Sequence, residues 1–267
     1  MSYGSLPVGE SRPAKRSMRS AIDEGPLVGT FQILGSPAVT EVLALSGADI
    51  IVADAEHAAF DLPILEQFVR AGDVRGASVL IRVPGIGPDL SRALDTGAAG
   101  VVVPRVESAA EAEAIVRATR FPPVGARGLG AARATLYGLD LVSHRESAND
   151  DLLVVAMIET RAGLDAVDEI VAVDGIDVIL IGPADLSSSL GAAIGSTEHT
   201  DAVSRILETA LAAGRHVGIH CPGAESAASY RDRGVRLLLI GTDVSFLSGA
   251  ASADLRAVPF IDERPTS

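Results

Sequence analysis

Three ionisable residues follow directly on an apolar run in the segment IIVADAEHAAFD, residues 50–61. Asp54, Glu56 and His57 stand where the run ends, so a buried strand would carry them to its carboxyl end. A neutral imidazole can act as a general base near pH 7, and a neighbouring carboxylate can orient it. We therefore interpret His57 as a candidate general base.

Two further acids stand at the ends of later apolar runs. Glu159 lies in MIET and Asp185 lies in GPADLS. The ends of adjacent strands lie about 5 Å apart, so both carboxylates can reach one ion. Carboxylates without Cys or His beside them favour a hard cation, Mg2+ or Mn2+, with water or substrate oxygens completing the shell. The alternative is that both acids interact with helix N-termini, where ADLS would serve as a cap.

Basic and imidazole side chains also stand near strand ends. Arg82, in SVLIRV, keeps its charge in a desolvated site and can stabilise an oxyanion; the alternative is a structural ion pair with Asp54 or Glu56. His216 and His220 share one face of a predicted strand. Because no nearby acid or cysteine completes a metal site, we interpret them as core or strand-end histidines.

Eight short, apolar and β-branched runs must position these residues. They cover residues 28–34, 49–54, 78–83, 100–106, 152–159, 177–183, 216–221 and 236–241. The segments between them have apolar residues at spacings of three and four, and several close with Gly. Eight strands, each followed by a helix, predict a (β/α)8 barrel with its site at the carboxyl ends of the strands. A doubly wound open sheet is the alternative.

The two ends of the chain differ from its middle in composition. Residues 1–24 are polar and rich in Ser, Pro and Gly, which predicts a flexible N-terminal tail, and residues 259–267 predict a C-terminal tail. Residues 25–258 then form a single catalytic barrel domain. The longest interruption, residues 121–151, predicts an extended loop after the fourth strand.

Composition excludes several classes of protein. The 267 residues carry a net charge of −13, which argues against nucleic acid or an anionic membrane as partner. No run reaches the ~18 apolar residues of a membrane span. With one cysteine, Cys221, no intrachain disulfide can form, and we expect a cytoplasmic location. The only lysine, Lys15, lies in the predicted tail, which argues against a Schiff-base mechanism.

Several motifs occur in one order over residues 28–247: GTF, ADAEHAAFD, IRVPG, LDTGAAGVVVPRV, FPPVGARGLG, MIET, GPADLS and LLLIGTDVSFL. Together they resemble the HpcH/HpaI family of metal-dependent class II pyruvate aldolases, which includes 4-hydroxy-2-oxoheptanedioate and 2-keto-3-deoxy-sugar-acid aldolases. The resemblance implies a barrel of the phosphoenolpyruvate/pyruvate type and a divalent cation, Mg2+ or Mn2+, with Co2+ as a third candidate. It also implies a homohexamer, commonly a trimer of dimers that exchange the last helix.

The resemblance assigns roles residue by residue. Glu159 of MIET and Asp185 of GPADLS match the metal ligands. His57 of AEHA matches the base, and Arg82 of IRVPG matches the residue that stabilises charge on the pyruvate oxygen. Asp95 of LDTG matches the carboxylate that raises the basicity of the histidine.

Four positions correspond to the substrate-binding part of the family pattern, two of them with a different residue. Ala184 and Asp185 would offer backbone amides to the pyruvate carboxylate. Phe31 stands where the family often has Trp, and Met157 stands where it often has Gln, two residues before the metal-binding Glu. These two departures bear on which aldehyde the enzyme uses more than on the reaction that it catalyses.

The sequence therefore predicts a lyase that reversibly cleaves a 4-hydroxy-2-oxo acid to pyruvate and an aldehyde. One alternative is a related metal–enolate lyase that acts on an acyl-CoA or decarboxylates a 2-oxo acid. An alternative of another class is a non-catalytic protein that binds metal or an oxo acid.

Overall fold

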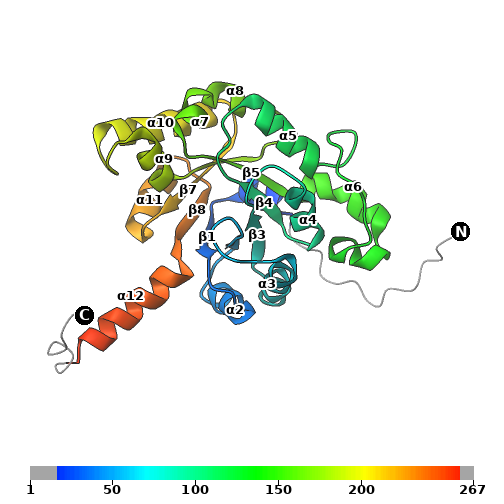
Figure 1. Ribbon diagram of the computed structural model, residues 1–267, viewed down its shortest axis with the longest axis horizontal. Helices are drawn as coiled ribbons and strands as arrows, with labels where there is room; N and C mark the ends of the chain where they lie inside the picture. Colours follow the sequence, from blue (N-terminus) through cyan, green and yellow to red (C-terminus); the bar gives the residue numbers. More distant parts are fainter. Residues whose placement is uncertain (1–16, 259–267) are drawn as a thin grey trace, which may run out of the picture.

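Eight parallel strands close into a barrel in chain order in the computed structural model, which describes residues 17–258 (Figure 1). Each strand pairs with the next one along the chain, and the last pairs with the first. The strands are β1 (Leu27–Gln32), β2 (Ile50–Asp54), β3 (Ser78–Arg82), β4 (Gly100–Val103), β5 (Leu153–Ile158), β6 (Val178–Ile181), β7 (His216–Cys221) and β8 (Leu237–Thr242). The predicted (β/α)8 barrel is confirmed.

Helices follow the strands and surround the barrel (Figure 1). Those of the first half are α1 (Met18–Glu24), α2 (Pro37–Leu45), α3 (Leu62–Arg75), α4 (Asp89–Asp95) and α5 (Ala109–Thr119). The 3-10 helix η1 (Arg133–Gly138) and α6 (Leu141–Asp151) come next. The second half contains α7 (Arg161–Asp165), α8 (Val167–Val171), α9 (Pro183–Leu190), α10 (Thr197–Ala212), α11 (Ala224–Asp232) and α12 (Asp243–Arg256).

The alternation of side chains along each strand divides the core in two. In β5, Leu153, Val155 and Met157 belong to the cluster inside the barrel. Val154 and Ala156 belong to the cluster between strands and helices. Because both faces are buried, the strands are apolar throughout, which explains why their positions could be predicted from short Val- and Ile-rich runs.

Helix α1 corrects the predicted N-terminal tail. Met18, Ala21 and Ile22 are buried in the cluster inside the barrel, together with the strand residues Leu27 and Leu237. The spacing of three and four between these residues gives α1 one apolar face. The prediction of a flexible tail over residues 1–24 is therefore wrong for residues 17–24, and the folded domain begins before residue 25. Residues 1–16 and the predicted tail 259–267 lie outside the described residues.

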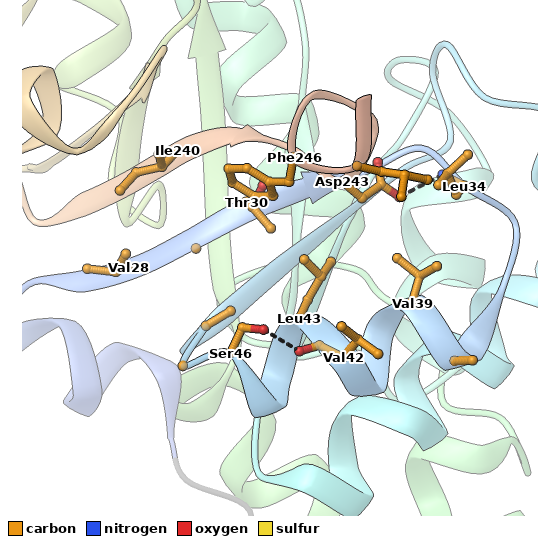
Figure 2. A pocket seen from close by; sticks show the side chains of 15 residues that line it. Val28, Thr30, Leu34, Val39, Val42, Leu43, Ser46, Ile240, Asp243 and Phe246 are labelled. Atoms are coloured by element: carbon orange, nitrogen blue, oxygen red, sulfur yellow. Dashed lines mark hydrogen bonds between the residues drawn. The ribbon is translucent and has the colours of Figure 1, made fainter. Parts of the chain in front are cut away.

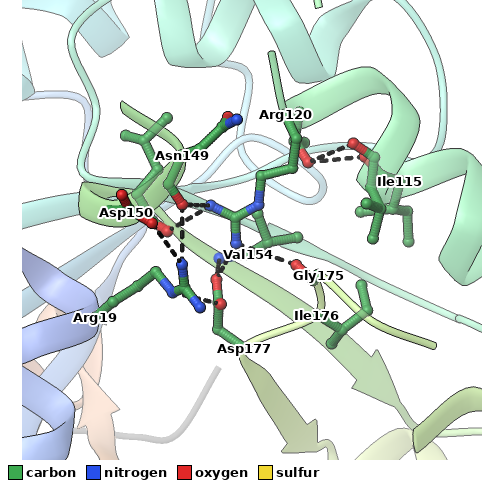
Figure 3. A network of polar contacts seen from close by, with 12 residues as sticks. Arg19, Ile115, Arg120, Asn149, Asp150, Val154, Gly175, Ile176 and Asp177 are labelled. Atoms are coloured by element: carbon green, nitrogen blue, oxygen red, sulfur yellow. Dashed lines mark hydrogen bonds and ion pairs between the residues drawn. The ribbon is translucent and has the colours of Figure 1, made fainter. Parts of the chain in front are cut away.

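A network of ion pairs and hydrogen bonds connects α1 to the barrel (Figure 3). Asp177, just before β6, forms ion pairs with Arg120 and with Arg19, whose Nε lies 2.9 Å from Oδ1 of Asp177. Arg120 also donates to the carbonyl oxygens of Asn149 at 2.8 Å and Leu152 at 3.0 Å. Four chain segments therefore meet at the N-terminal end of the barrel.

The long connection between β4 and β5 is more ordered than predicted. Its second half forms η1 and α6, so the extended loop predicted for residues 121–151 is wrong there. Helix α6 has a largely polar sequence, LVSHRESANDD, with Ala148 as its buried residue. The bonds from Arg19 and Arg120 to carbonyl oxygens near its end are tertiary contacts that its sequence does not reveal.

Helix α12 does not lie against the barrel like the other helices. It projects outward from the end of β8 (Figure 1), and Leu247 and Leu255 on it are more than 60% exposed. Within residues 17–258, no helix is both long and apolar enough to cross a membrane.

Candidate active site

A small cavity of about 160 Å³ opens among the carboxyl ends of the strands. The side chains and backbone around it come from β1, β2, β3, β5, β7 and β8 and from the segment after β6. The lining residues are Phe31, Ile33, Asp54, Arg82, Met157, Gly182, Pro183, Ala184, Asp185, His220 and Thr242. Several of the residues singled out in the sequence therefore meet at one end of the barrel.

Arg82 is held by an ion pair across two adjacent strands. Asp54 and Arg82 are register partners on β2 and β3. Nε and Nη2 of Arg82 donate to the two oxygens of Asp54 at 2.9 and 2.6 Å. Burial opposes ionisation of Asp54, but the hydrogen bond and charge of Arg82 lower its pKa overall. The structural pair considered for Arg82 is thus present, and Arg82 also lines the cavity.

His57 follows β2, three residues after Asp54, and is not among the residues that line the cavity; its side chain is 62% exposed. Asp54 Oδ1 accepts hydrogen bonds from the amides of Glu56 and His57 at 3.1 and 3.2 Å, which fixes the turn after β2. His57 Nε2 lies 3.6 Å from Glu56 Oε2. Burial raises the pKa of Glu56, against the charges of Arg82 and His57.

Asp95 does not take the predicted position beside His57. It ends α4, and its carboxylate forms an ion pair with Arg127 at 2.8 Å. Among the described residues, the carboxylate that His57 contacts is that of Glu56. The role of Asp95 in raising the basicity of His57 stays a prediction, since the contact of Asp95 in this chain is with Arg127.

Glu159 presents one unused oxygen. The residue follows β5 and is 3% exposed. Its Oε1 accepts a hydrogen bond from the amide of Arg105 at 3.0 Å, which Arg105 donates from a left-handed conformation with φ 53°. Its Oε2 is buried and has no hydrogen-bond partner within residues 17–258. Burial and the nearby charges of Asp185 and Glu56 raise the pKa of Glu159 to about 7.

Asp185 is presented by the first turn of α9. Pro183 begins this helix and Gly191 ends it in a left-handed conformation with φ 69°. Just before it, a Cβ on Gly182 would come within 2.6 Å of Glu159 Oε2, so only glycine leaves this oxygen room. A buried, unpartnered carboxylate oxygen beside a second acid fits a divalent cation.

The donor set limits how such a cation would be held. No group of three or more His, Cys, Asp or Glu side chains in residues 17–258 is arranged as a metal site. Glu159 and Asp185 would therefore share the ion with water or with substrate oxygens. All-oxygen coordination of this kind suits Mg2+ or Mn2+.

Three predicted substrate-binding residues also line the cavity. Phe31 and Met157 are buried and form apolar wall, and Cζ of Arg82 lies 4.8 Å from the centroid of the Phe31 ring. Ala184 lies in the first turn of α9, where backbone amides have no partner within the helix. The site therefore combines an apolar wall with amides that can bind an anion.

His220 is a cavity residue that the sequence interpretation missed. It lies near the end of β7 and its ring packs edge-on against Phe31, with centroids 5.6 Å apart. His216, four residues earlier on β7, lies 2.7 Å from Asp23 at the opposite end of the strand. The position of His220, next to last in its predicted strand, was the signal that could have placed it at the site.

Comparison with known proteins gives one consistent result. Residues 27–250 match the HpcH/HpaI aldolase/citrate lyase family. The chain is 39% identical over 246 residues to the hydroxypyruvate/pyruvate aldolase of Roseovarius nubinhibens, covering 90% of this chain and 95% of that protein. It is 36% identical over 242 residues to the 4-hydroxy-2-oxovalerate aldolase of Novosphingobium aromaticivorans, covering 88% and 91%.

A solved structure agrees with these relatives. The HpcH/HpaI aldolase/citrate lyase family protein from Burkholderia cenocepacia J2315 is similar with a TM-score of 0.85 and 34% identity. The similarity covers 91% of this chain and 99% of that chain. The resemblance noted in the sequence and the prediction of a class II aldolase are thus confirmed, and the chain belongs to the HpcH/HpaI aldolase/citrate lyase family.

Proposed function

We propose that this enzyme reversibly cleaves a 4-hydroxy-2-oxo acid to pyruvate and an aldehyde, with a divalent cation held by Glu159 and Asp185. The observation that carries the proposal is the buried, unpartnered Oε2 of Glu159, near the charge of Asp185. Asp185 lines the same cavity as Arg82. The aldolase names of the two relatives, one for hydroxypyruvate/pyruvate and one for 4-hydroxy-2-oxovalerate, support a 2-oxo acid as substrate.

The cation would be Mg2+ or Mn2+, with Co2+ as a third candidate. When bound, it would supply Lewis-acid polarisation of the 2-oxo group. The amides of Ala184 and Asp185, at the start of α9, would bind the carboxylate of the substrate. Phe31 and Met157 would exclude water from the apolar side of the cavity.

Two charged residues would carry the proton and the developing charge. His57 would remove the proton from the 4-hydroxyl group, directly or through water, and Glu56 lies close enough to orient its ring. Carbon–carbon cleavage leaves negative charge on the pyruvate oxygen. Arg82, which lines the cavity and is fixed in place by Asp54, would stabilise that charge.

The direct test is pyruvate release from 4-hydroxy-2-oxo acids with and without a chelator. Activity should disappear on complete removal of divalent cations and return when Mg2+ or Mn2+ is added. A His57→Ala variant should lose pyruvate formation but still bind the cation. Full activity of chelated, metal-free enzyme would contradict the proposal.

We also propose that the enzyme forms a homohexamer, a trimer of dimers that exchange α12. An apolar groove of about 700 Å³ runs between β1, α2 and the base of α12 (Figure 2). Val39, Val42 and Leu43 of α2 and Ile240 of β8 line it. Helix α12 projects from the barrel, and this apolar groove would receive α12 of a second copy.

The assembly can be tested by measuring the mass of the enzyme in solution by light scattering. Wild type should have the mass of six chains. Val42→Glu, at a groove position that is 60% exposed, should give smaller species. The matched control Val74→Glu, on α3 outside the groove and 71% exposed, should not. A wild-type monomer, or a Val42→Glu variant that still has the mass of six chains, would contradict the exchange.

Location and other partners remain predictions from composition. The net charge of −13 continues to argue against a nucleic-acid partner. We propose a cytoplasmic location, because the single cysteine, Cys221, allows no intrachain disulfide.

A further inference from the structure

We propose that His220 recognises a hydroxyl group on one of the reactants, so that this enzyme prefers a hydroxylated aldehyde or a 3-hydroxylated 2-oxo acid over the unsubstituted compound. The inference rests on the proposed aldolase function and assigns a specificity-determining residue within the same site. Three observations support it: the position of the ring, its tautomer and the hydrogen bonds that the neighbouring polar side chains already form.

The position of His220 brings it to the reactants. It lines the same cavity as Arg82 and Asp185, and both Arg82 and His220 contact the ring of Phe31. Its ring meets that of Phe31 at an interplanar angle of 71°, an edge-to-face contact that limits its rotation. A reactant that fills the cavity would therefore meet the histidine in a fixed orientation.

The tautomer of His220 follows from one hydrogen bond. Nε2 lies 3.2 Å from the carbonyl oxygen of Gly241, and a carbonyl oxygen can only accept. Nε2 therefore carries the proton, and in the neutral ring Nδ1 holds a lone pair that accepts a hydrogen bond. Burial lowers the pKa of His220, and the charge of Arg82 acts in the same direction, against the bond to Gly241. The ring is therefore neutral near pH 7.

Nδ1 is free to accept a bond from a reactant. Within the described part of the chain, Nδ1 has no hydrogen-bond partner. It is also absent from the set of fully buried polar atoms without a partner, so it is not fully buried. The atom is thus accessible, on a side chain that lines the cavity. A lone pair in this position attracts an O–H group and disfavours a carboxylate or a carbonyl oxygen.

The neighbouring polar side chains are already committed. Asp54 is paired with Arg82, and the hydroxyl of Thr242 accepts the amide hydrogen of Ser245 at 3.0 Å. Phe31 and Met157 offer no strong hydrogen-bonding group. Among the described residues that line the cavity, His220 therefore supplies a neutral acceptor that no other contact uses.

Either of the two reactants, the aldehyde or the 2-oxo acid, can carry a hydroxyl group that would donate to Nδ1. A hydroxyl on the aldehyde is present in glycolaldehyde and absent in acetaldehyde. A hydroxyl on the 2-oxo acid is present in hydroxypyruvate and absent in pyruvate. A site that hydrogen-bonds a substrate hydroxyl discriminates against the compound that lacks it, because the acceptor is then left unpaired.

The test compares preferences in the synthetic direction with the Mg2+- or Mn2+-loaded enzyme. One arm pairs pyruvate with glycolaldehyde or acetaldehyde, and the other pairs acetaldehyde with hydroxypyruvate or pyruvate. Wild type should favour the hydroxylated compound by about tenfold in kcat/KM in one of the two arms. The arm that shows the preference identifies the reactant that carries the hydroxyl.

Three variants then separate recognition from packing. His220→Phe keeps a ring against Phe31 but has no acceptor, so the ratio of kcat/KM values should fall to about one. His220→Leu should do the same, and it serves if the Phe variant does not fold. His220→Asn places an amide oxygen near the position of Nδ1 and should retain part of the preference. Thermal unfolding of each variant shows which samples are folded.

The outcomes are distinct. An unchanged preference in folded His220→Phe or His220→Leu, or a wild type that favours the hydroxylated compound in neither arm, would overturn the role of His220. Absence of aldol product with every pair of reactants would instead contradict the proposed function, and the inference with it.

Discussion

Buried charge is fully paired at the N-terminal end of the barrel but only partly paired at the carboxyl end, where the Arg82–Asp54 pair stands beside unpaired carboxylate oxygens. At the N-terminal end, Asp177 and Arg120 are almost fully buried and both are paired and hydrogen-bonded (Figure 3). At the carboxyl end, Glu159 and Glu56 each keep a buried oxygen that forms no hydrogen bond within residues 17–258. Buried polar groups are normally satisfied, so two buried carboxylate oxygens without a hydrogen bond, close to the charge of Asp185, favour a cation at this end.

The difference between the two ends indicates that buried charge serves stability at the N-terminal end and function at the carboxyl end. At the N-terminal end, burial raises the pKa of Asp177 and lowers that of Arg120, so both ions lose hydration and depend on their partners. At the carboxyl end, burial and neighbouring acids raise the pKa of Glu159 to about 7. The first end should respond to substitution with a loss of stability, and the second with a loss of activity.

The largest expected effect is at the N-terminal end. Arg120→Met leaves the carboxylate of Asp177 buried with only Arg19 as a charged partner, so the free energy of unfolding should fall by about 3–5 kcal/mol. The activity of the molecules that remain folded should stay close to that of wild type. Chemical denaturation and active-site-normalised kinetics measure the two quantities.

A surface pair provides the control for this variant. Arg92 pairs with Asp89 at 3.4 Å and its side chain is 61% exposed. Arg92→Met should change stability by less than about 1 kcal/mol, because exposed ion pairs contribute little. Equal effects of the two substitutions would mean that the buried network is not what holds α1 and the barrel together.

The second prediction concerns the carboxyl end. Glu159→Gln removes the charge of a proposed metal ligand while Oε1 can still accept the amide hydrogen of Arg105. Activity should fall by more than about 100-fold. This is a larger loss than is typical when a residue that only supports a metal ligand is replaced. Titration calorimetry should show weakened Mn2+ binding, and circular dichroism should show an intact fold. Wild-type affinity for Mn2+ in this variant would argue against Glu159 as a ligand.

In the metal-free state, the stability of wild type should show a pH dependence that the Glu159→Gln variant lacks. The pKa of Glu159 in the folded protein is raised to about 7 from 4.5. The folded state therefore holds the proton more tightly than the unfolded state, and stability is lost as the pH rises from about 4.5 to about 7. Relative to Glu159→Gln, metal-free wild type should become less stable across this range. Parallel stability curves for the two proteins would contradict the raised pKa.

The smallest expected effect is at Arg105, whose side chain is 67% exposed. Its backbone amide, not its side chain, bonds to Glu159, and its φ of 53° is one that glycine adopts readily. Arg105→Gly should therefore change kcat/KM by less than about twofold, since the amide is kept. A large loss of activity would show that the side chain itself takes part in the reaction.

Most of the fold could be predicted because burial on both faces makes each strand a short apolar run. Helix α1 was missed although Met18, Ala21 and Ile22 have helical spacing, because seven residues inside a polar segment give a weak signal. Helix α6 was missed because its stability depends on contacts to Arg19 and Arg120 that are distant in sequence.

The site could be predicted where strand ends determine position. Glu159, Asp185 and Arg82 end adjacent or nearby strands, so the barrel brings them together. Asp95 ends a helix, and the sequence does not show that its partner is Arg127. The role of His220 was missed because it depends on a tautomer that only the contact with Gly241 reveals.

The most direct measurement of the central claim is an anomalous diffraction map from crystals grown with Mn2+ and oxalate, a mimic of the pyruvate enolate. We expect one manganese peak per chain, in contact with Glu159 Oε2 and the carboxylate of Asp185. A map without manganese at these two residues, or with the ion bound elsewhere on the barrel, would contradict it.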